Sequence, residues 1–427
     1  MLRAPVRTLL PDQIPVPVSE AGQATAADRC RCYRERLVAL ALPEDLTERR
    51  VAVAAAVEGW LRGEGIGSHD ERSALLCELV DDLAGLGPLE PLLADSNVTE
   101  ILVNGLERIR VEVDGRLLDT PFRFRDADQL RGVIDRILVG SGRRIDDGAP
   151  MVDARLPDGS RLNAVLPPVA VGAPLVTMRR PPNRRRGFQE LIASGSLDNR
   201  IAAFLHAAVL GECNLIVCGG TGAGKTTLLA ALVALVPPEE RVVVLEDVSE
   251  LCIEHPHQAR LECRPPGRDG GGEVGLRDLV RNSLRMRPDR IVVGEVRGPE
   301  AADMVAAMNT GHQGSMATLH ANSARDALRR LEGMLAMAWP ALGERQPRRW
   351  IASAVDVIVH CERDATGRRR VGEVAVVDHD DAGELQATAL FEHDGRAAAR
   401  ATGEVPRRCL ERMAANGVTF PPSLFAR

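Results

Sequence analysis

One eight-residue segment constrains the fold of this chain more than any other feature of its sequence. Residues 219–226 read GGTGAGKT, after the apolar run 215–218 and before an apolar, helix-forming stretch. This is the pattern G-x-x-x-x-G-K-[ST] in the setting that it requires, a buried strand, a glycine-rich turn and a helix. The segment therefore predicts a phosphate-binding loop in an α/β domain.

Each part of this segment has an expected contact with a bound nucleotide. The glycines let main-chain N–H groups close around the β-phosphate, Lys225 bridges β- and γ-oxygens, and the Thr226 hydroxyl ligates Mg²⁺. ATP and Mg²⁺ are thus the expected cofactors. The expected nucleotide-binding residues are Gly219, Gly220, Thr221, Gly222, Ala223, Gly224, Lys225, Thr226 and Thr227.

The lysine in this segment is the only one in the chain. Lysine and arginine together number 54, and every one of them except Lys225 is an arginine. A compact ammonium on a flexible stem reaches between phosphate oxygens where a planar guanidinium cannot. The composition therefore indicates that Lys225 stands where arginine would not serve.

Two further strands end in carboxylates. Residues 290–295 form an apolar strand that ends in Glu295, although Gly294 occupies a place where such strands often carry aspartate. Glu246 and Asp247 end the apolar run 242–245. Because parallel strands end at the same edge of a sheet, these acids are expected to converge on the γ-phosphate. Glu295 would then orient water or help hold magnesium, and Asp247 is a second candidate magnesium ligand.

Two histidines, His312 and His320, surround a short expected strand at 315–319. Their place after the Glu295 strand suggests that they sense the γ-phosphate. Zinc would need more ligands nearby, and the nine cysteines show no repeated metal-binding spacing, so no zinc site is expected.

The periodicity of apolar residues predicts the domain organisation. The expected fold class is α/β, with a P-loop domain on a mostly parallel sheet after a small α/β domain and a helical N-terminal extension. The expected parts are a Pro-rich tail at 1–27, a helical region at 28–94, a small α/β domain at 95–180, a linker at 181–200 and the ATPase domain at 201–427.

Composition excludes several classes of function. The net charge is −6 and aromatic residues make up 3% of the chain, which argues against direct binding of nucleic acid. No run of about 18 apolar residues occurs, and prolines interrupt residues 1–20, so neither a membrane span nor a signal peptide is expected. We expect a cytoplasmic protein.

At this point the sequence resembles a known family. The segments VLEDVSEL (244–251), RDLVRNSLRMRPDRIVVGEVRGPEA (277–301) and MNTGHQGSMATLHANS (308–323) are similar to the Asp box, Walker B and His box of type II/IV secretion ATPases. Upstream, VTEILVNG (98–105) and MVDARLPDGSRLNAVLPPVA (151–170) resemble the CpaF-like branch, which powers assembly of Flp/Tad pili.

The resemblance implies that the P-loop domain is RecA-like and that the chain forms a hexameric ring that hydrolyses ATP. It further implies work on inner-membrane platform proteins, peripheral to the inner face of the cytoplasmic membrane. It also implies that arginines of the N-terminal domain and linker reach the nucleotide. Arg155, Arg161 and Arg179 occupy the matching stretches, and Arg297, which follows Glu295, is a further candidate.

Three other functions stay open on the sequence alone. The first is a conjugation-type ATPase that assists DNA transfer, and the second is a RecA-like protein that binds DNA itself. The third is a nucleotide-gated scaffold without turnover, which would lack competent carboxylates such as Glu246 and Glu295. The sequence names neither the cargo nor the direction of work.

Overall fold

The computed structural model divides into two compact units, Met1–Asn183 and Arg184–Arg427. It describes residues 36–37, 43, 46–63, 69–113, 115–139, 141, 143–156, 158–180, 187–264, 271–341, 343, 345–364, 367–379, 384–393 and 399–426. The tail predicted at 1–27 lies outside the described residues. The predicted linker, 181–200, contains helix α6 (Phe188–Ala193) and the start of α7 (Asn199–Leu210), which belong to the second unit.

Helices precede the sheet in the described part of the first unit. The helices α2 (Leu46–Gly63) and α3 (His69–Ala84) pack through an apolar cluster that includes Val53, Val57 and Leu79. A short 3-10 turn, η1 (Gly87–Leu89), and α4 (Glu90–Ala94) lead into the sheet.

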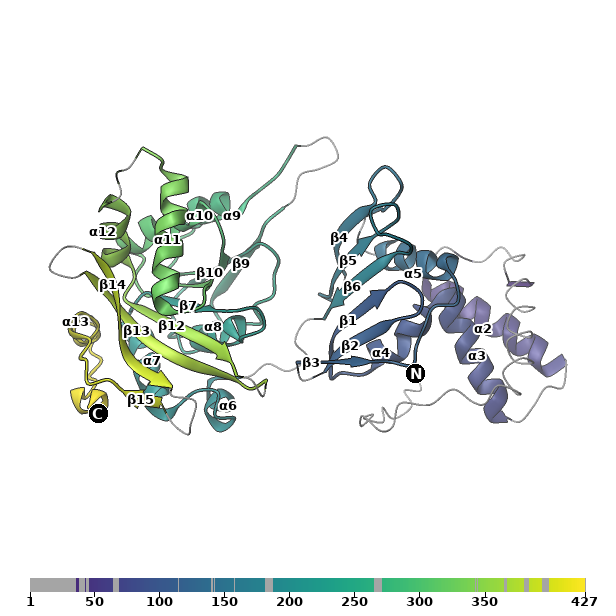
Figure 1. Ribbon diagram of the computed structural model, residues 1–427, viewed down its shortest axis with the longest axis horizontal. Helices are drawn as coiled ribbons and strands as arrows, with labels where there is room; N and C mark the ends of the chain where they lie inside the picture. The colour runs from purple at the N-terminus through teal and green to yellow at the C-terminus, as the bar shows by residue number, and fades with distance from the viewer. Residues whose placement is uncertain are drawn as a thin grey trace. The chain divides into compact units, whose positions relative to one another are not determined.

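Six described strands form an antiparallel sheet in this unit, in the order β3-β2-β1-β6-β5-β4 (Figure 1). Helix α5 (Ala127–Val139) buries its apolar face, including Val133 and Ile137, against one side of the sheet. Along β4 and β6 buried and exposed residues alternate, so the other side of these strands is open. The strands are β1 (Val98–Asn104), β2 (Ile109–Val113), β3 (Arg116–Asp119), β4 (Met151–Arg155), β5 (Arg161–Val165) and β6 (Leu175–Arg179).

The second unit is built on a larger sheet. Its described strands run in the order β15-β14-β13-β12-β7-β11-β10-β8-β9, and neighbours from β12 to β9 are parallel. The remaining strands pair antiparallel. The strands are β7 (Leu215–Gly219), β8 (Val242–Glu246), β9 (Gln258–Glu262), β10 (Arg290–Val296), β11 (Met316–His320), β12 (Val357–Arg363), β13 (Arg369–His379), β14 (Leu385–His393) and β15 (Ala399–Ala401).

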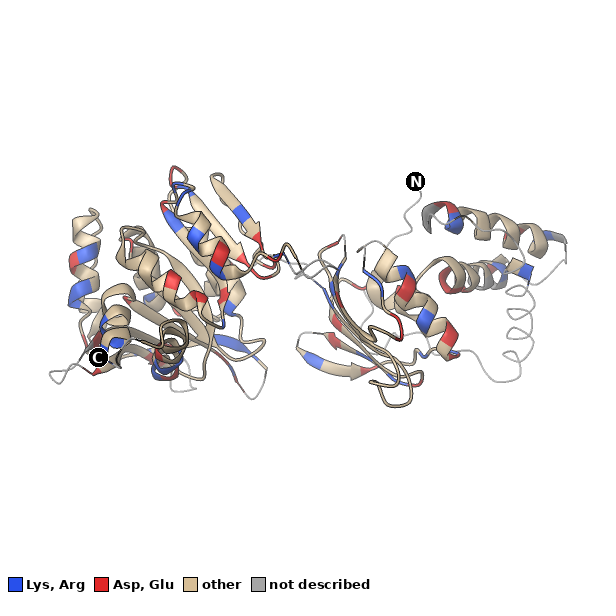
Figure 2. Ribbon diagram, turned by 90° about the horizontal axis from the view of Figure 1, so that it is seen from above, with Lys and Arg blue, Asp and Glu red and all other residues tan. Residues whose placement is uncertain are grey.

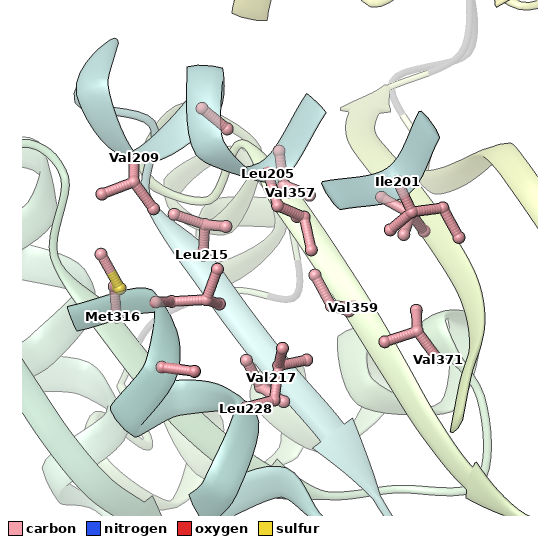
Figure 3. Packing of buried hydrophobic residues seen from close by; sticks show 14 of the residues in the cluster. Ile201, Leu205, Val209, Leu215, Val217, Leu228, Met316, Val357, Val359 and Val371 are labelled. Carbon is pink, nitrogen blue, oxygen red and sulfur yellow. The ribbon is translucent and has the colours of Figure 1, made fainter. Parts of the chain in front are cut away.

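Helices cover both faces of this sheet. Figure 3 shows one face, where Ile201 and Leu205 of α7 and Leu228 of α8 (Lys225–Val233) pack on strand residues such as Val217 and Val359. On the same side lie α13 (Arg407–Ala415) and the 3-10 turn η2 (Pro422–Phe425). The other face carries α9 (Leu276–Ser283), α10 (Glu300–Asn309), α11 (Ala324–Ala338) and α12 (Arg345–Ala354).

This arrangement explains the unbroken apolar runs of the sequence. All five residues of β7 and all five of β8 are buried, because both of their faces lie under helices. This confirms the predicted fold class, in which a small α/β domain precedes, along the chain, an α/β ATPase domain on a mostly parallel sheet. Among the described helices none is long and apolar enough to cross a bilayer.

Candidate active site

The glycine-rich loop leaves the carboxyl end of β7 and enters α8. Gly222 and Gly224 take positive φ angles of 70° and 98°, a left-handed conformation that glycine adopts without steric cost. A Cβ atom at Gly220 or Gly222 would meet no atom within 4 Å. The loop therefore has open space in front of the first turn of α8, where main-chain N–H groups lack partners within the helix.

Lys225 is the first residue of α8, directly after the glycines of this loop, and is only 9% exposed. Its Nζ atom donates hydrogen bonds to the carbonyl oxygens of Gly219 and Gly220, both at 3.0 Å. Burial lowers the pKa of the ammonium, and the nearby Glu295 carboxylate opposes that shift. The loop thus holds its cation in a partly desolvated place, where attraction to phosphate is stronger than in bulk water.

Glu246, at the end of β8, is 3% exposed and tightly held. One carboxylate oxygen accepts hydrogen bonds from the main-chain nitrogens of Glu250 and Leu251, at 2.8 and 2.7 Å, and the other lies 3.0 Å from Arg260 Nη2. This geometry fits a residue that positions the turn after β8. Arg260, on the edge strand β9, is a partner that the sequence analysis missed, since nothing local to its segment signals it.

Gly294 has a structural reason to be glycine. A Cβ atom at this position would lie 2.9 Å from Cγ of Glu246, closer than real Cβ contacts come. The absence of a side chain in β10 therefore makes room for the Glu246 carboxylate on the neighbouring strand. The strand β10 thus lacks the aspartate that such strands often carry, and the acid next to this position is Glu246 of β8.

Glu295 follows at a register irregularity. The pairing of β10 with β11 shifts between Val293 and Val296, and such bulges re-aim side chains near sites. One carboxylate oxygen of Glu295 accepts a hydrogen bond from Nε of Arg297 at 2.9 Å. Arg297 is 66% exposed, so this pair lies at the surface of the sheet edge, next to the lysine.

The oxygen donors at this edge suit magnesium, a hard cation that prefers hydroxyl, carboxylate and phosphate oxygens. Thr226 follows Lys225 in the first turn of α8. Asp247 is exposed just after β8, where the Cys263 thiol lies 3.4 Å from one of its oxygens. Both oxygens of Glu246 have protein partners, so Thr226, Asp247 and Glu295 stay the candidate magnesium ligands.

The two predicted histidines separate. His320 ends β11 and pairs in register with Gly219, the first residue of the loop. His312 precedes β11, and its Nδ1 lies 3.3 Å from the Ala307 carbonyl oxygen at the end of α10. The strand β11 separates the two histidines, so they lie at its opposite ends. Within this chain only His320 is level with the glycine-rich loop.

In the first unit the three predicted arginines come together. Arg155 on β4 is directly opposite Arg161 on β5, and Arg161 is directly opposite Arg179 on β6. The row continues to Glu100 on β1, whose carboxylate lies 3.5 Å from Arg179. Burial raises the pKa of Glu100, although Arg179 opposes this. Residues far apart in sequence thus form one basic row across the open face of three strands.

Comparison with known proteins decides the family. A profile described as "Type II/IV secretion system protein" matches residues 82–360. A putative conjugal transfer protein of Mycobacterium tuberculosis is 41% identical over 322 residues, which cover 74% of this chain and 91% of that protein. The chain belongs to the type II/IV secretion system ATPase family.

Two more proteins are similar to this secretion ATPase. The probable conjugal transfer protein TrbB of Sinorhizobium fredii is 36% identical over 65% of the chain and 82% of its own length. The crystallised ATPase DotB of Yersinia pseudotuberculosis has a TM-score of 0.50 at 18% identity, covering 67% of this chain and 77% of that one, which shows a likeness of fold.

We predict that Lys225→Ala abolishes hydrolysis of ATP by the secretion ATPase and severely weakens nucleotide binding, because the loop loses its ammonium. Lys225→Arg should fail too, since a larger, planar guanidinium cannot replace a compact ammonium that reaches between phosphate oxygens. ATPase rates and ADP titrations of both variants measure this. Near-normal turnover of the arginine variant would refute the argument from the single lysine.

A second prediction concerns Gly294. The new Cβ atom of Gly294→Ala would displace the Glu246 side chain, so the ATPase rate should fall about tenfold or more while ADP affinity stays within about threefold. Gly333→Ala in α11 is the matched control, because its Cβ atom would meet nothing within 4 Å. Equal rates for the two variants would show that the fit between Gly294 and Glu246 has no role in turnover.

Proposed function

We propose that this chain is an ATP-hydrolysing motor that works as a homohexamer in a type II/IV-like secretion machine, specifically one that assembles Flp/Tad pili. It would act on platform proteins of the cytoplasmic membrane, peripheral to its inner face. The observation that carries the proposal is the meeting of the Lys225 loop, Glu246 and Glu295 at one sheet edge in a chain of this family. The segments 98–105 and 151–170, similar to the CpaF-like branch, favour the pilus assignment.

The proposed reaction is transfer of the γ-phosphoryl group to water. Oxygen of the water attacks the γ-phosphorus, the bond from that phosphorus to the β,γ-bridging oxygen breaks, and ADP and phosphate result. Glu295 accepts the proton of the attacking water. Lys225 stabilises negative charge on the β- and γ-oxygens, and a magnesium ion held by Thr226 and Asp247 would neutralise more of it.

Glu246, in this scheme, is a positioning residue. Its hydrogen bonds to Glu250 and Leu251 fix the turn that carries Asp247. His320, which is level with Gly219, would sense the γ-phosphate. Arg297 holds the Glu295 carboxylate and thereby selects its orientation.

The basic row of the first unit supplies the missing cation in this proposal. Charge that spreads over the γ-phosphoryl oxygens in the transition state is commonly stabilised by an arginine in addition to lysine and magnesium. Arg155, Arg161 and Arg179 are level on three neighbouring strands, so together they would attract the negative charge of a γ-phosphate. Closing the N-terminal domain on the nucleotide would then couple hydrolysis to motion.

If the row acts on the γ-phosphate, Arg155→Ala, Arg161→Ala or Arg179→Ala should lower the turnover rate by about 10³-fold and leave ADP affinity nearly unchanged. The rates are measured beside Glu295→Gln, which should be inactive. Thr177→Ala, on the same open face of β6 as Arg179, is the control and should behave as the unaltered chain. Normal turnover in all three arginine variants beside an inactive Glu295→Gln would contradict domain closure.

The second candidate is a conjugation-type ATPase, and the printed names of the M. tuberculosis and S. fredii relatives favour it. A net charge of −6 weighs against direct handling of DNA. Basic and acidic residues are also interspersed along the ribbons of both units (Figure 2). The proposed motor therefore acts on protein.

This choice predicts that neither single-stranded nor duplex DNA binds tightly at physiological salt or stimulates the ATPase rate. The measurement is DNA affinity against salt concentration, together with ATPase assays with and without DNA. An affinity that falls steeply with salt, accompanied by stimulated turnover, would favour the conjugation-type function instead.

A further inference from the structure

The strands β12 and β13 lie on the side of β7 away from Glu246 and Glu295. Cys361 of β12 is in register with Gly219, and a Cβ atom at Gly219 would lie 2.3 Å from the Cys361 carbonyl oxygen. The first residue of the loop therefore packs directly on the main chain of β12. Side chains of β12 and β13 next to this contact therefore lie close to a nucleotide that the loop would bind.

Just beyond it, two arginines stand directly opposite each other. Arg363 of β12 pairs in register with Arg369 of β13. On β12, Arg363 follows the buried Cys361 by two residues, and on β13, Arg369 precedes the buried Val371 by two residues. Cys361 and Val371 belong to the apolar cluster that packs against α8. Because alternate residues of a strand share a face, Arg363 and Arg369 belong to the face that carries the loop.

Arg369 is the nearer of the two to the loop. A Cβ atom built on Gly224, the residue before Lys225, would lie 3.7 Å from Cδ and 3.9 Å from Cβ of Arg369. The aliphatic stem of Arg369 thus passes alongside the turn that enters α8. Its neighbour Arg370 belongs to the opposite face, where its Nε lies 2.6 Å from a Glu362 oxygen.

The strand order indicates which part of the nucleotide this arginine would meet. Glu295 on β10 and Glu246 on β8 lie on one side of β7, beyond β11. The strands β12 and β13 lie on its other side. A nucleotide whose γ-phosphate faces Glu295 and Lys225 would direct the rest of its phosphate chain toward β12 and β13.

We propose that Arg369 binds the α-phosphate of the nucleotide, as a cation separate from those that act on the γ-phosphate. This inference rests on the proposed binding of nucleotide by the Lys225 loop. A guanidinium forms charge-assisted hydrogen bonds with phosphate oxygens. The facing Arg363 instead donates from Nε to the Gly367 carbonyl oxygen, so Arg369 is the arginine next to the loop. Because ADP keeps its α-phosphate, Arg369 acts on binding of both ADP and ATP.

The test is ADP binding to the full chain by titration calorimetry, with the ATPase rate measured at varied ATP. Arg369→Ala should weaken ADP binding about tenfold or more and raise the KM for ATP by a similar factor, with kcat changed less than about threefold. Arg369→Lys keeps the charge and should recover part of the affinity. Arg368→Ala, the exposed neighbour, is the matched control and should bind ADP as the unaltered chain does.

The outcomes separate this inference from the proposed function. If the unaltered chain binds ADP, Lys225→Ala does not, and Arg369→Ala binds as well as the unaltered chain, the α-phosphate contact is refuted while the loop keeps its role. A fall in kcat without a change in KM also refutes it, since that would be a contact with the γ-phosphate. Failure of the unaltered chain to bind ADP would refute both proposals.

Discussion

The position of β7 between two parallel neighbours is the constraint on which the site depends. All five of its residues are buried, and its last residue, Gly219, is level with His320 of β11 and packs on Cys361 of β12. Helices cover both faces of β7, so the chain can turn only where this strand ends. The strands on both sides thus hold the glycine loop in place before any ligand binds. Because the loop is already ordered, it loses less conformational entropy when a ligand binds.

Elements with strong apolar patterns could be predicted from the sequence, and elements defined by their neighbours could not. The buried strand at 215–219 and the helix that begins at Lys225 follow from local sequence. The edge strand β9 has no buried residue, and α12 combines several arginines with a proline, so neither shows the expected apolar period. Both are stabilised by packing that only the fold supplies.

The same division holds for the site. A motif with fixed spacing identified the loop, because its residues act through one continuous turn. Arg260 and the fit of Gly294 around Glu246 depend on contacts between strands, which no local pattern records. Arg155, Arg161 and Arg179 become level only through the register of β4, β5 and β6. His312 and His320 are close in sequence, yet they lie at opposite ends of β11.

The single lysine also makes the candidate site chemically unique within the chain. Apart from the α-amino group of the chain, Lys225 is the only aliphatic amine on which acylating or carbamoylating reagents can act. It is 9% exposed and hydrogen-bonded to two carbonyl oxygens, so the folded protein shields it. The rate at which an amine-directed reagent modifies Lys225 therefore measures opening of this loop, and no surface lysine contributes to the signal. For the same reason, cross-linkers that join lysines would find no second lysine in the chain.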